Sequence, residues 1–241
     1  MYILTKRPIG DITFFQRRLP FIERHEYSQN GEDGIIAAVF AMIGTTNRSC
    51  VEFGVEDGME SNTRHLIVKK GWKGLLMDGS HEVLERRVHR EFITTENIED
   101  LFRKYHVPKE FDLLSIDIDG NDYWIWKAIT TYRPRVVIIE YNAHLPPEES
   151  KTIPYDPAFV WDTTDYYGAS LLALRKLGEA KGYTLLGTDR NGVNAFFVES
   201  SLVPGHFDPL LWPQTYHPPA FKGKAGNRHP KDPRNRGWVD V

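Results

Sequence analysis

Apolar positions recur along the middle of the chain with two different periods. Ile35, Ile36, Val39 and Ile43 follow one another at helical spacing, directly after the polar stretch 28–33, whose side chains can cap a helix. Further helix-like stretches cover residues 59–70, 81–89 and 123–132. Gly71 directly follows the first of these stretches and is expected to end it.

Short apolar runs between these stretches predict strands. The runs lie at residues 50–54, 74–78, 92–95, 112–118 and 135–140. The last two runs are apolar on both faces, which is typical of parallel strands covered by helices on both sides. Because strands and helices alternate with short links, the pattern predicts a doubly wound α/β sheet.

The pattern changes after an expected helix at residues 170–181. Two further strands, at 183–187 and 194–198, are separated by only residues 188–193. This link is too short for a crossover helix, so the two strands are expected to pair as an antiparallel hairpin. The predicted fold class is therefore α/β, with a Rossmann-like, doubly wound, mostly parallel sheet that closes in an antiparallel hairpin.

Three regions differ in composition. Residues 28–200 carry the alternating pattern and are expected to form one domain, whereas residues 1–27 are basic and aromatic and are interpreted as an N-terminal arm. Residues 201–241 hold seven of the fifteen prolines and are expected to lack regular structure. This tail is also basic and aromatic. Three roles stay open for it: binding an anionic acceptor, packing on a neighbouring subunit of a homo-oligomer, or remaining solvated.

Composition narrows the class of protein. The chain has 241 residues, 41% hydrophobic and 26% charged, which excludes a disordered protein. The longest apolar run, 35–43, is too short to cross a membrane, and a net charge of −3 argues against a nucleic-acid partner. The single cysteine, Cys50, excludes an intrachain disulfide, and the first residues lack the apolar core of a signal peptide, so cytoplasmic residence is expected.

Polar side chains follow every strand expected to lie in the parallel sheet. The strand ends read Glu52–Gly58, Met77–Ser80, Thr95–Asn97, Asp117–Asp122 and Glu140–Asn142. In an open parallel sheet these ends lie at one edge, where ligands bind. The sequence therefore predicts an acidic binding site at this edge.

The first of these turns favours one ligand class over another. It contains Gly54 and Gly58, which allow close approach of the backbone, but it lacks the G-x-G-x-x-G spacing of a dinucleotide site. Asp78 ends the second strand, where a carboxylate can accept both hydroxyls of a ribose. An adenosine with a positive charge at its other end fits these residues, and S-adenosylmethionine is such a molecule.

Residues 28–200 resemble a class I S-adenosylmethionine-dependent methyltransferase. The resemblance rests on the order Glu52-x-Gly54-x-x-Asp57-Gly58, Asp78, Asp117-Ile-Asp-Gly and Ile139-Glu140, and it is closest to the FkbM-like branch, whose members methylate hydroxyls of sugars and secondary metabolites. The resemblance implies S-adenosylmethionine as cofactor and a small-molecule or carbohydrate acceptor. The cofactor-binding positions that it implies are Gln29, Glu52, Gly54, Asp57, Gly58, Asp78, Gly79, Asn97 and Asp117.

Candidates for the catalytic groups lie after the fourth and fifth strands. Asp117 and Asp119 are expected to face the same side and to raise one another's pKa, which suits a general base. His144 is a second candidate base. A magnesium site formed by Asp117, Glu140 and Asn142 is a less favoured alternative.

Residues before the last long helix are candidates for the acceptor pocket. They are Tyr166, Tyr167 and Ser170. Two other functions stay open from the sequence: a nicotinamide-dependent oxidoreductase on a related sheet, and a non-catalytic scaffold that retains the fold.

Overall fold

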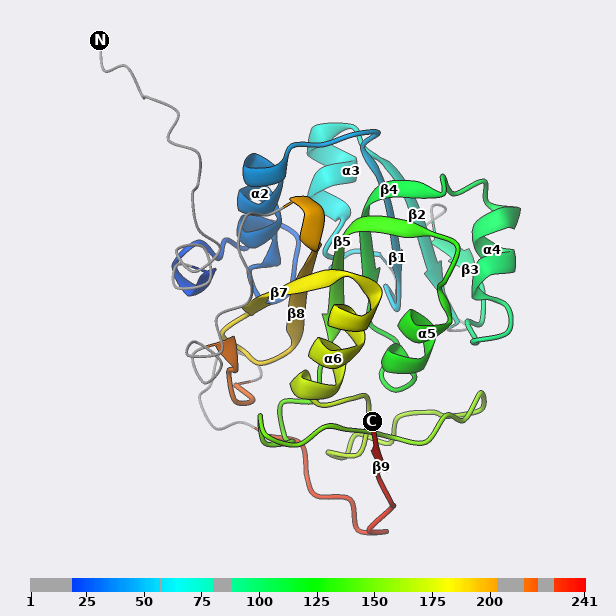
Figure 1. Ribbon diagram of the computed structural model, residues 1–241, viewed down its shortest axis with the longest axis vertical. Helices are drawn as coiled ribbons and strands as arrows, with labels where there is room; N and C mark the ends of the chain where they lie inside the picture. Colours follow the sequence, from blue (N-terminus) through cyan, green and yellow to red (C-terminus); the bar gives the residue numbers. More distant parts are fainter. Residues whose placement is uncertain (1–18, 57, 80–87, 203–214, 221–227) are drawn as a thin grey trace.

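The core of the molecule is one seven-stranded sheet. The computed structural model describes residues 19–56, 58–79, 88–202, 215–220 and 228–241. The strands are β1 (Ser49–Phe53), β2 (Lys73–Asp78), β3 (Val88–Arg90), β4 (Glu110–Ile116), β5 (Arg133–Glu140), β7 (Tyr183–Thr188) and β8 (Asn194–Glu199). They are arranged in the order β3-β2-β1-β4-β5-β8-β7 (Figure 1).

The strand order places a switch point at the centre of the sheet. Strands β3, β2, β1, β4 and β5 are parallel, while β8 runs antiparallel between β5 and β7. The chain moves outward from β1 to β3 and then crosses back to β4. Loops after β1 and β4 therefore diverge at their carboxyl ends and leave room for a ligand. The predicted fold class is confirmed, hairpin included.

Helices cover both faces of the sheet. On one face α2 (Glu32–Ile43) and α3 (Arg64–Lys70) pack in one apolar cluster with side chains of β1, β4, β5 and β8. On the other face α4 (Ile98–Lys104), α5 (Asp122–Ala128) and α6 (Leu171–Lys181) form the larger cluster. Both faces of β4 and β5 are thus buried, which explains their continuous apolar sequence.

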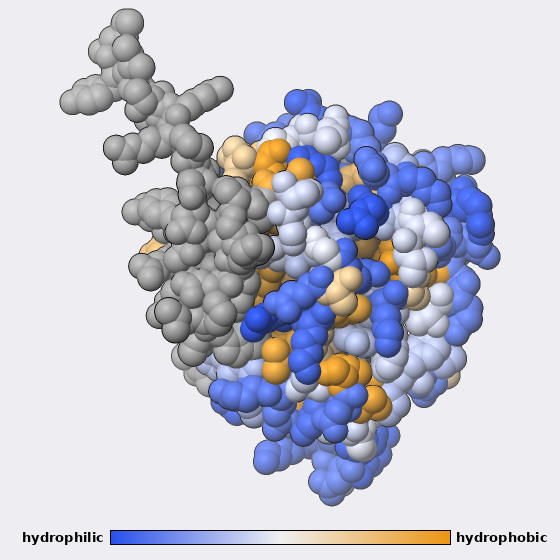
Figure 2. All heavy atoms as spheres, viewed as in Figure 1, coloured by the Kyte–Doolittle hydropathy of each residue, from blue (hydrophilic) through white to orange (hydrophobic). Residues whose placement is uncertain are grey.

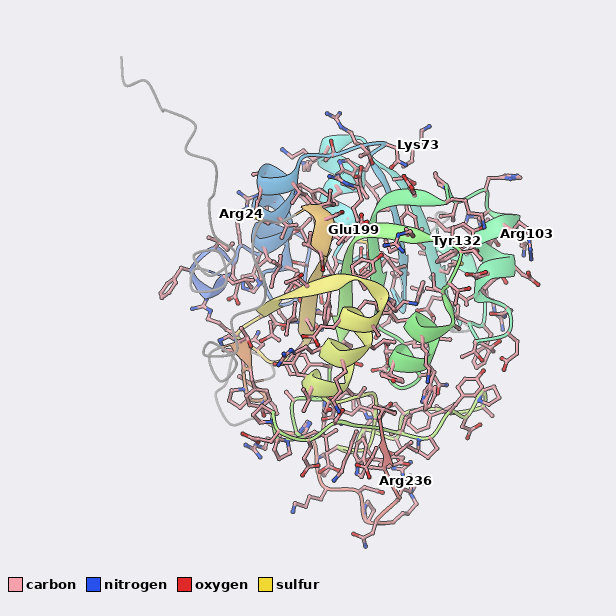
Figure 3. All side chains as sticks on the ribbon, in the orientation of Figure 1. Arg24, Lys73, Arg103, Tyr132, Glu199 and Arg236 are labelled. Carbon is pink, nitrogen blue, oxygen red and sulfur yellow. The ribbon has the colours of Figure 1, made fainter. Side chains whose placement is uncertain are left out.

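The C-terminal segment is tied to the loop between β5 and α6. Strands β6 (Lys151–Thr152) and β9 (Val239–Asp240) form a small antiparallel sheet below the main one (Figure 1). Arg236, labelled at the lower end of Figure 3, donates to Asp162 and Asp232 and lies 4.1 Å from the ring centre of Tyr166. The expectation that residues 201–241 lack regular structure is therefore wrong for β9; residues 203–214 and 221–227 lie outside the described part.

Two short 3-10 helices, Leu19–Phe21 and Ser200–Leu202, flank the main domain. On the face shown in Figure 2, apolar side chains form separate areas between polar ones. Among the described residues, no helix has the length and apolar character needed to cross a membrane.

Several element boundaries differ from the prediction. The third strand is residues 88–90 rather than 92–95, because Val88 supplies the buried side chain that pairs with Leu76. The expected helix at 81–89 falls mostly on 80–87, outside the described residues, and its last two positions are in β3. Helix α3 begins at Arg64, five residues after the predicted start of this helix at residue 59.

Two further differences concern helices. Helix α5 ends at Ala128, four residues before the predicted end at Tyr132. Helix α4 was not predicted, although Ile98, Leu101 and Phe102 are spaced for one buried helical face.

One buried ion pair fixes the amino end of the central strands. Asp112 on β4 accepts from Arg135 on β5 (2.8 Å) and from the backbone N–H groups of Thr46 and Arg48. Burial alone would raise the pKa of Asp112, but the bonds from Arg135, Thr46 and Arg48 outweigh it and leave that pKa below its ordinary value. The pair therefore joins the link before β1 to strands β4 and β5.

We expect Asp112→Ala to lower the free energy of unfolding by about 3–5 kcal/mol at neutral pH, because the buried charge of Arg135 loses its carboxylate partner and the N–H groups of Thr46 and Arg48 lose their acceptor. Glu199→Ala is the matched control, since its pair with Arg133 is 3.5 Å long and partly exposed, and it should cost less than about 1 kcal/mol. Urea denaturation measures both. Equal losses would contradict this role of Asp112.

Candidate active site

A cavity of 1310 Å³ opens at the carboxyl ends of the parallel strands. Its wall includes residues that follow β1, β2, β3 and β4, together with the last residue of β5 and the start of β8. Residues of segments 23–32 and 190–194 close one end, and Phe159, Trp161 and His229 belong to the same wall. The predicted edge of the sheet is therefore where the cavity lies.

Gly54 sets the floor of this cavity. Its φ is +77°, and a Cβ at this position would lie 1.2 Å from the backbone oxygen of Asp117. No other residue fits, because β1 and β4 touch here through their backbones. Gly58, with φ of +73°, closes the turn by donating to the Val55 carbonyl at 2.7 Å. Asp57 lies outside the described residues.

Glu52 lines the cavity but its carboxylate also holds the start of α3. Its oxygens accept from the backbone N–H groups of Asn62 (2.8 Å) and Thr63 (2.9 Å) and from the Thr63 hydroxyl (2.6 Å). Burial raises the pKa of Glu52, and these hydrogen bonds oppose the rise. These contacts indicate that Glu52 helps to determine the shape of the cavity wall.

Asp78 ends β2 in the cavity wall, next to Gly79. Its Oδ2 accepts from the backbone N–H of Glu56 at 2.8 Å, which fixes the carboxylate against the glycine turn. Beside Gly79 lies Phe92, whose side chain also lines the cavity and is 56% exposed. An exposed aromatic ring beside a ribose-type carboxylate suits a flat base. Phe92 was not among the predicted site residues, because residues 92–95 have the pattern of a strand.

Gln29 lies at the opposite end of the cavity, in a loop anchored by Asp33. Oδ2 of Asp33 accepts from three consecutive backbone N–H groups, those of residues 26–28, at 2.7–2.9 Å. The hairpin between β7 and β8 holds the same loop, since Arg190 donates to Glu23 (2.6 Å) and Asn194 donates to Glu32 (2.8 Å). Two distant parts of the chain thus form this end together.

Three carboxylates meet between β4 and β5. Asp117, Asp119 and Glu140 each present an oxygen atom, and these atoms lie within 4.8 Å of one another. Burial and the neighbouring acids raise the pKa of Asp117 and of Glu140 well above the ordinary range. Asp119 reaches solvent through the cavity, yet partial removal from water and the charges of Asp122, Glu56 and Asp78 raise its pKa to about 6.

Asp117 and Asp119 therefore converge, but not for the reason expected. Strand β4 ends at Ile116, so strand alternation does not govern the two aspartates. Asp119 has a φ of +56°, and this turn brings its side chain back toward Asp117. Asp122 stabilises the turn by accepting from the N–H groups of Ile118 and Gly120, both at 2.9 Å.

His144 and Asn142 have structural partners and do not line the cavity. The ring Nδ1 of His144 lies 3.1 Å from Asn142 Oδ1, and its Nε2 accepts from the backbone N–H of His229 at 3.0 Å. Asn142 donates to the carbonyls of Asp165 and Tyr167. Asp119, rather than Asn142, therefore lies beside Asp117 and Glu140 in the described cavity wall. His144 is not part of this wall.

Asn97 is also engaged elsewhere. Its side chain accepts from the N–H of Thr94 and donates to the carbonyl of Phe92, both at 2.8 Å, and so closes the turn before α4. It is absent from the described cavity wall. The interpretation of Asn97 as an adenine contact has no support in this geometry.

An aromatic wall lies beside the carboxylates. Phe159 packs on Gly120, where a Cβ would lie 2.4 Å from its ring, and Trp161 has its ring 4.7 Å from that of His229. The expected acceptor residues stand outside the described cavity wall: Tyr166 donates to Gly237, Tyr167 packs 5.9 Å from Trp161, and Ser170 caps α6. The F-x-W pattern at 159–161, aromatic within a polar stretch, was an overlooked signal.

Comparison with protein families gives one match. The family described as the methyltransferase FkbM domain matches residues 46–183, which include the ends of β1, β2, β4 and β5. A search of the curated proteins found no match to this chain.

Among solved structures, the chain is similar to an S-adenosylmethionine-dependent methyltransferase from Clostridium acetobutylicum. The identity is 12%, the TM-score is 0.40, and the match covers 77% of this chain and 96% of that one. It is also similar to the CMeT domain of the citrinin polyketide synthase, at 11% identity and a TM-score of 0.39 over 63% of this chain and 46% of that longer chain. The match to TnmH has 15% identity and a TM-score of 0.39, and it covers 78% of this chain and 57% of that one. Likenesses this distant carry no information about the substrate.

We expect His144→Ala to lower stability and to leave S-adenosylhomocysteine binding within about twofold of the parent value. The loss should be about 1–3 kcal/mol, because Asn142 and the His229 N–H lose a buried partner. Isothermal titration calorimetry and urea denaturation separate the two effects. A large loss of affinity would restore His144 as a site residue.

The pH dependence of that stability has a defined sign. Burial and the nearby His229 and Arg228 lower the pKa of His144 to about 4, against the opposing charge of Asp165. Because the unfolded value is about 6.5, this contribution is present above about pH 6.5 and is lost as the pH falls toward 4. Denaturation at several pH values should show a smaller decline for His144→Ala than for the parent.

Proposed function

Because the chain belongs to the FkbM methyltransferase family, with S-adenosylmethionine as its cofactor, we propose that it methylates a hydroxyl group of a small, uncharged, polyhydroxylated acceptor. Carbohydrates and hydroxylated secondary metabolites are such acceptors. The observation that carries the proposal is the carboxylate cluster of Asp117, Asp119 and Glu140 beside an aromatic wall in one cavity. Carboxylates accept from acceptor hydroxyls, and aromatic rings stack on the apolar faces of sugars.

The methyl donor is proposed to bind along the glycine turn. Asp78 accepts from the ribose, and the exposed ring of Phe92 packs on the adenine. Gln29 and its loop cover the methionine end, while Glu52 and Gly54 shape the floor. The negative cavity favours the positive sulfonium over a pyrophosphate, so a nicotinamide cofactor is not favoured.

Transfer is an in-line displacement, in which the acceptor oxygen forms a bond to the methyl carbon as the sulfur–carbon bond breaks. Alignment of the two reactants supplies most of the acceleration. The acceptor hydroxyl also loses its proton, and Asp119 is the proposed base, since its pKa of about 6 leaves it mostly ionised near neutral pH. The sulfonium becomes a neutral thioether, which releases S-adenosylhomocysteine.

An anionic acceptor has less support from the described wall. Arg190 is the one Lys or Arg among the cavity residues of the described ranges, and it is paired with Glu23. The basic residues Lys222 and Lys224 lie outside the described part. A phosphorylated acceptor would therefore approach several uncompensated carboxylates at the described wall.

We expect Asp78→Ala to weaken S-adenosylhomocysteine binding by about ten- to a hundredfold, because two ribose hydroxyls lose a charged acceptor. Asp100→Ala is the matched control, because it removes the same group from an exposed position outside the described cavity wall, and it should leave the affinity unchanged. Isothermal titration calorimetry with S-adenosylhomocysteine and, separately, with NADH measures both. Binding of NADH in place of S-adenosylhomocysteine would overturn the donor assignment.

The acceptor class is tested by methyl transfer from radiolabelled S-adenosylmethionine to matched compounds. Glucose offers hydroxyl groups alone, and glucosamine offers hydroxyl groups and an amine. Glucose 6-phosphate adds an anionic group to the same hydroxyls. Label should enter glucose-type hydroxyls, and mass spectrometry with NMR identifies the methylated atom. Transfer to nitrogen, or preference for the phosphate, would contradict the proposed acceptor.

A further inference from the structure

Ionised together, the three carboxylates of the cluster would carry more negative charge than the methyl donor can balance. Three acidic side chains share one corner of the cavity, of which Glu140 is buried, Asp117 is half-buried and Asp119 is exposed. The charged neighbours that act most strongly on Asp117 and Glu140 are all acidic, namely Asp119, Asp122, Glu52 and Glu32. Arg190, the cation of the described wall, is paired with Glu23. A sulfonium supplies a single positive charge.

Glu140 gives an independent indication of a missing ligand. The residue is 9% exposed, and its Oε2 is buried and accepts no hydrogen bond from any described group. A buried carboxylate oxygen without a partner is costly, and native proteins rarely leave one. The Glu140 side chain reaches into the cluster, so the group that satisfies it belongs at the same corner.

The spacing of the three side chains fits a hard cation. Their ligand atoms lie within 4.8 Å of one another. Oxygen ligands on opposite sides of Mg²⁺ are about 4.2 Å apart, and for Ca²⁺ the separation is about 4.6–5.2 Å. Carboxylate oxygens without nitrogen or sulfur ligands favour such ions over zinc or copper. The exposed side of Asp119 leaves room for water or an acceptor oxygen as further ligands.

We propose that Asp117, Asp119 and Glu140 bind one divalent, oxygen-preferring cation, such as Mg²⁺, at the corner of the cavity between β4 and β5. The site itself does not depend on the methyl-transfer assignment. One consequence rests on the proposed function: a cation here polarises an acceptor hydroxyl and lowers its pKa beside the sulfonium.

The test uses Mn²⁺ as a probe for the full chain without donor or acceptor. Calorimetric titration, with the electron paramagnetic resonance of free Mn²⁺ as a second readout, should show one site per chain, and Mg²⁺ should compete for it. Glu140→Gln and Asp119→Asn should each weaken Mn²⁺ binding about tenfold or more. Asp119 is exposed, so its variant remains informative if Glu140→Gln folds poorly.

Glu60→Gln is the matched control. It removes the same charge from an exposed residue of the same cavity wall, outside the cluster, and should leave the affinity for Mn²⁺ unchanged. Equal weakening by all three variants would show diffuse attraction to an acidic cavity and overturn the site. Absence of saturable Mn²⁺ binding would overturn it as well.

Donor binding distinguishes this proposal from the proposed function. Affinities for S-adenosylmethionine and S-adenosylhomocysteine are measured with and without Mg²⁺. If the cluster only balances the sulfonium, Glu140→Gln weakens binding of S-adenosylmethionine but not of S-adenosylhomocysteine, and Mn²⁺ does not bind; that result overturns the metal site and leaves the methyltransferase assignment intact. Mn²⁺ binding without any donor binding would support the site and contradict the function.

Discussion

The backbone contact between the ends of β1 and β4 is the constraint on which the active site depends. At Gly54 the two strand ends approach so closely that the backbone oxygen of Asp117 occupies the place where a side chain would be. The N–H of Asp117 also donates to Phe53 at 3.2 Å. This contact fixes the glycine turn, the floor of the cavity and the first aspartate of the cluster in one rigid unit.

The second organising feature is negative charge held out of bulk water. Apolar strands β4 and β5 carry Asp117 and Glu140 at their ends, where the packed helices on both faces limit solvent. Such carboxylates resist ionisation unless a positive ligand joins them. Groups with such perturbed pKa values are a common property of binding sites. The aromatic wall adds an uncharged surface beside these carboxylates.

The sequence was a good guide wherever buried patterns or backbone requirements decide the structure. The two-faced apolar runs identified β4 and β5, and the short 188–193 link identified the hairpin. The location of the acidic edge followed from the strand order. Prediction was poor where tertiary pairing overrides local pattern, as in the region of Val88 and Phe92. Phe92 reads as a strand residue, although its ring lines the cavity.

Side-chain roles were the least predictable part. Asn97 and His144 are polar residues in suitable loops, and only their hydrogen bonds show that they stabilise turns and a neighbouring segment. Asp119 reaches the cluster through a left-handed backbone turn rather than through strand alternation. Sequence spacing contains neither kind of information. The aromatic wall depends on contacts between segments 155–167 and 228–241, which are separated by more than sixty positions.

The end of the cavity formed by segments 23–32 and 190–194 has a consequence for how the protein folds. Its walls are joined by bonds between residues more than 160 positions apart: Glu23 with Arg190, Asn30 with Asn191, and Glu32 with Asn194. Contacts of such long range form late, because closing a large loop costs entropy before any bond repays it. A chain still emerging from the ribosome therefore lacks this compartment until the hairpin has been synthesised. A ligand that needs this compartment would therefore bind only after the chain has completed its folding.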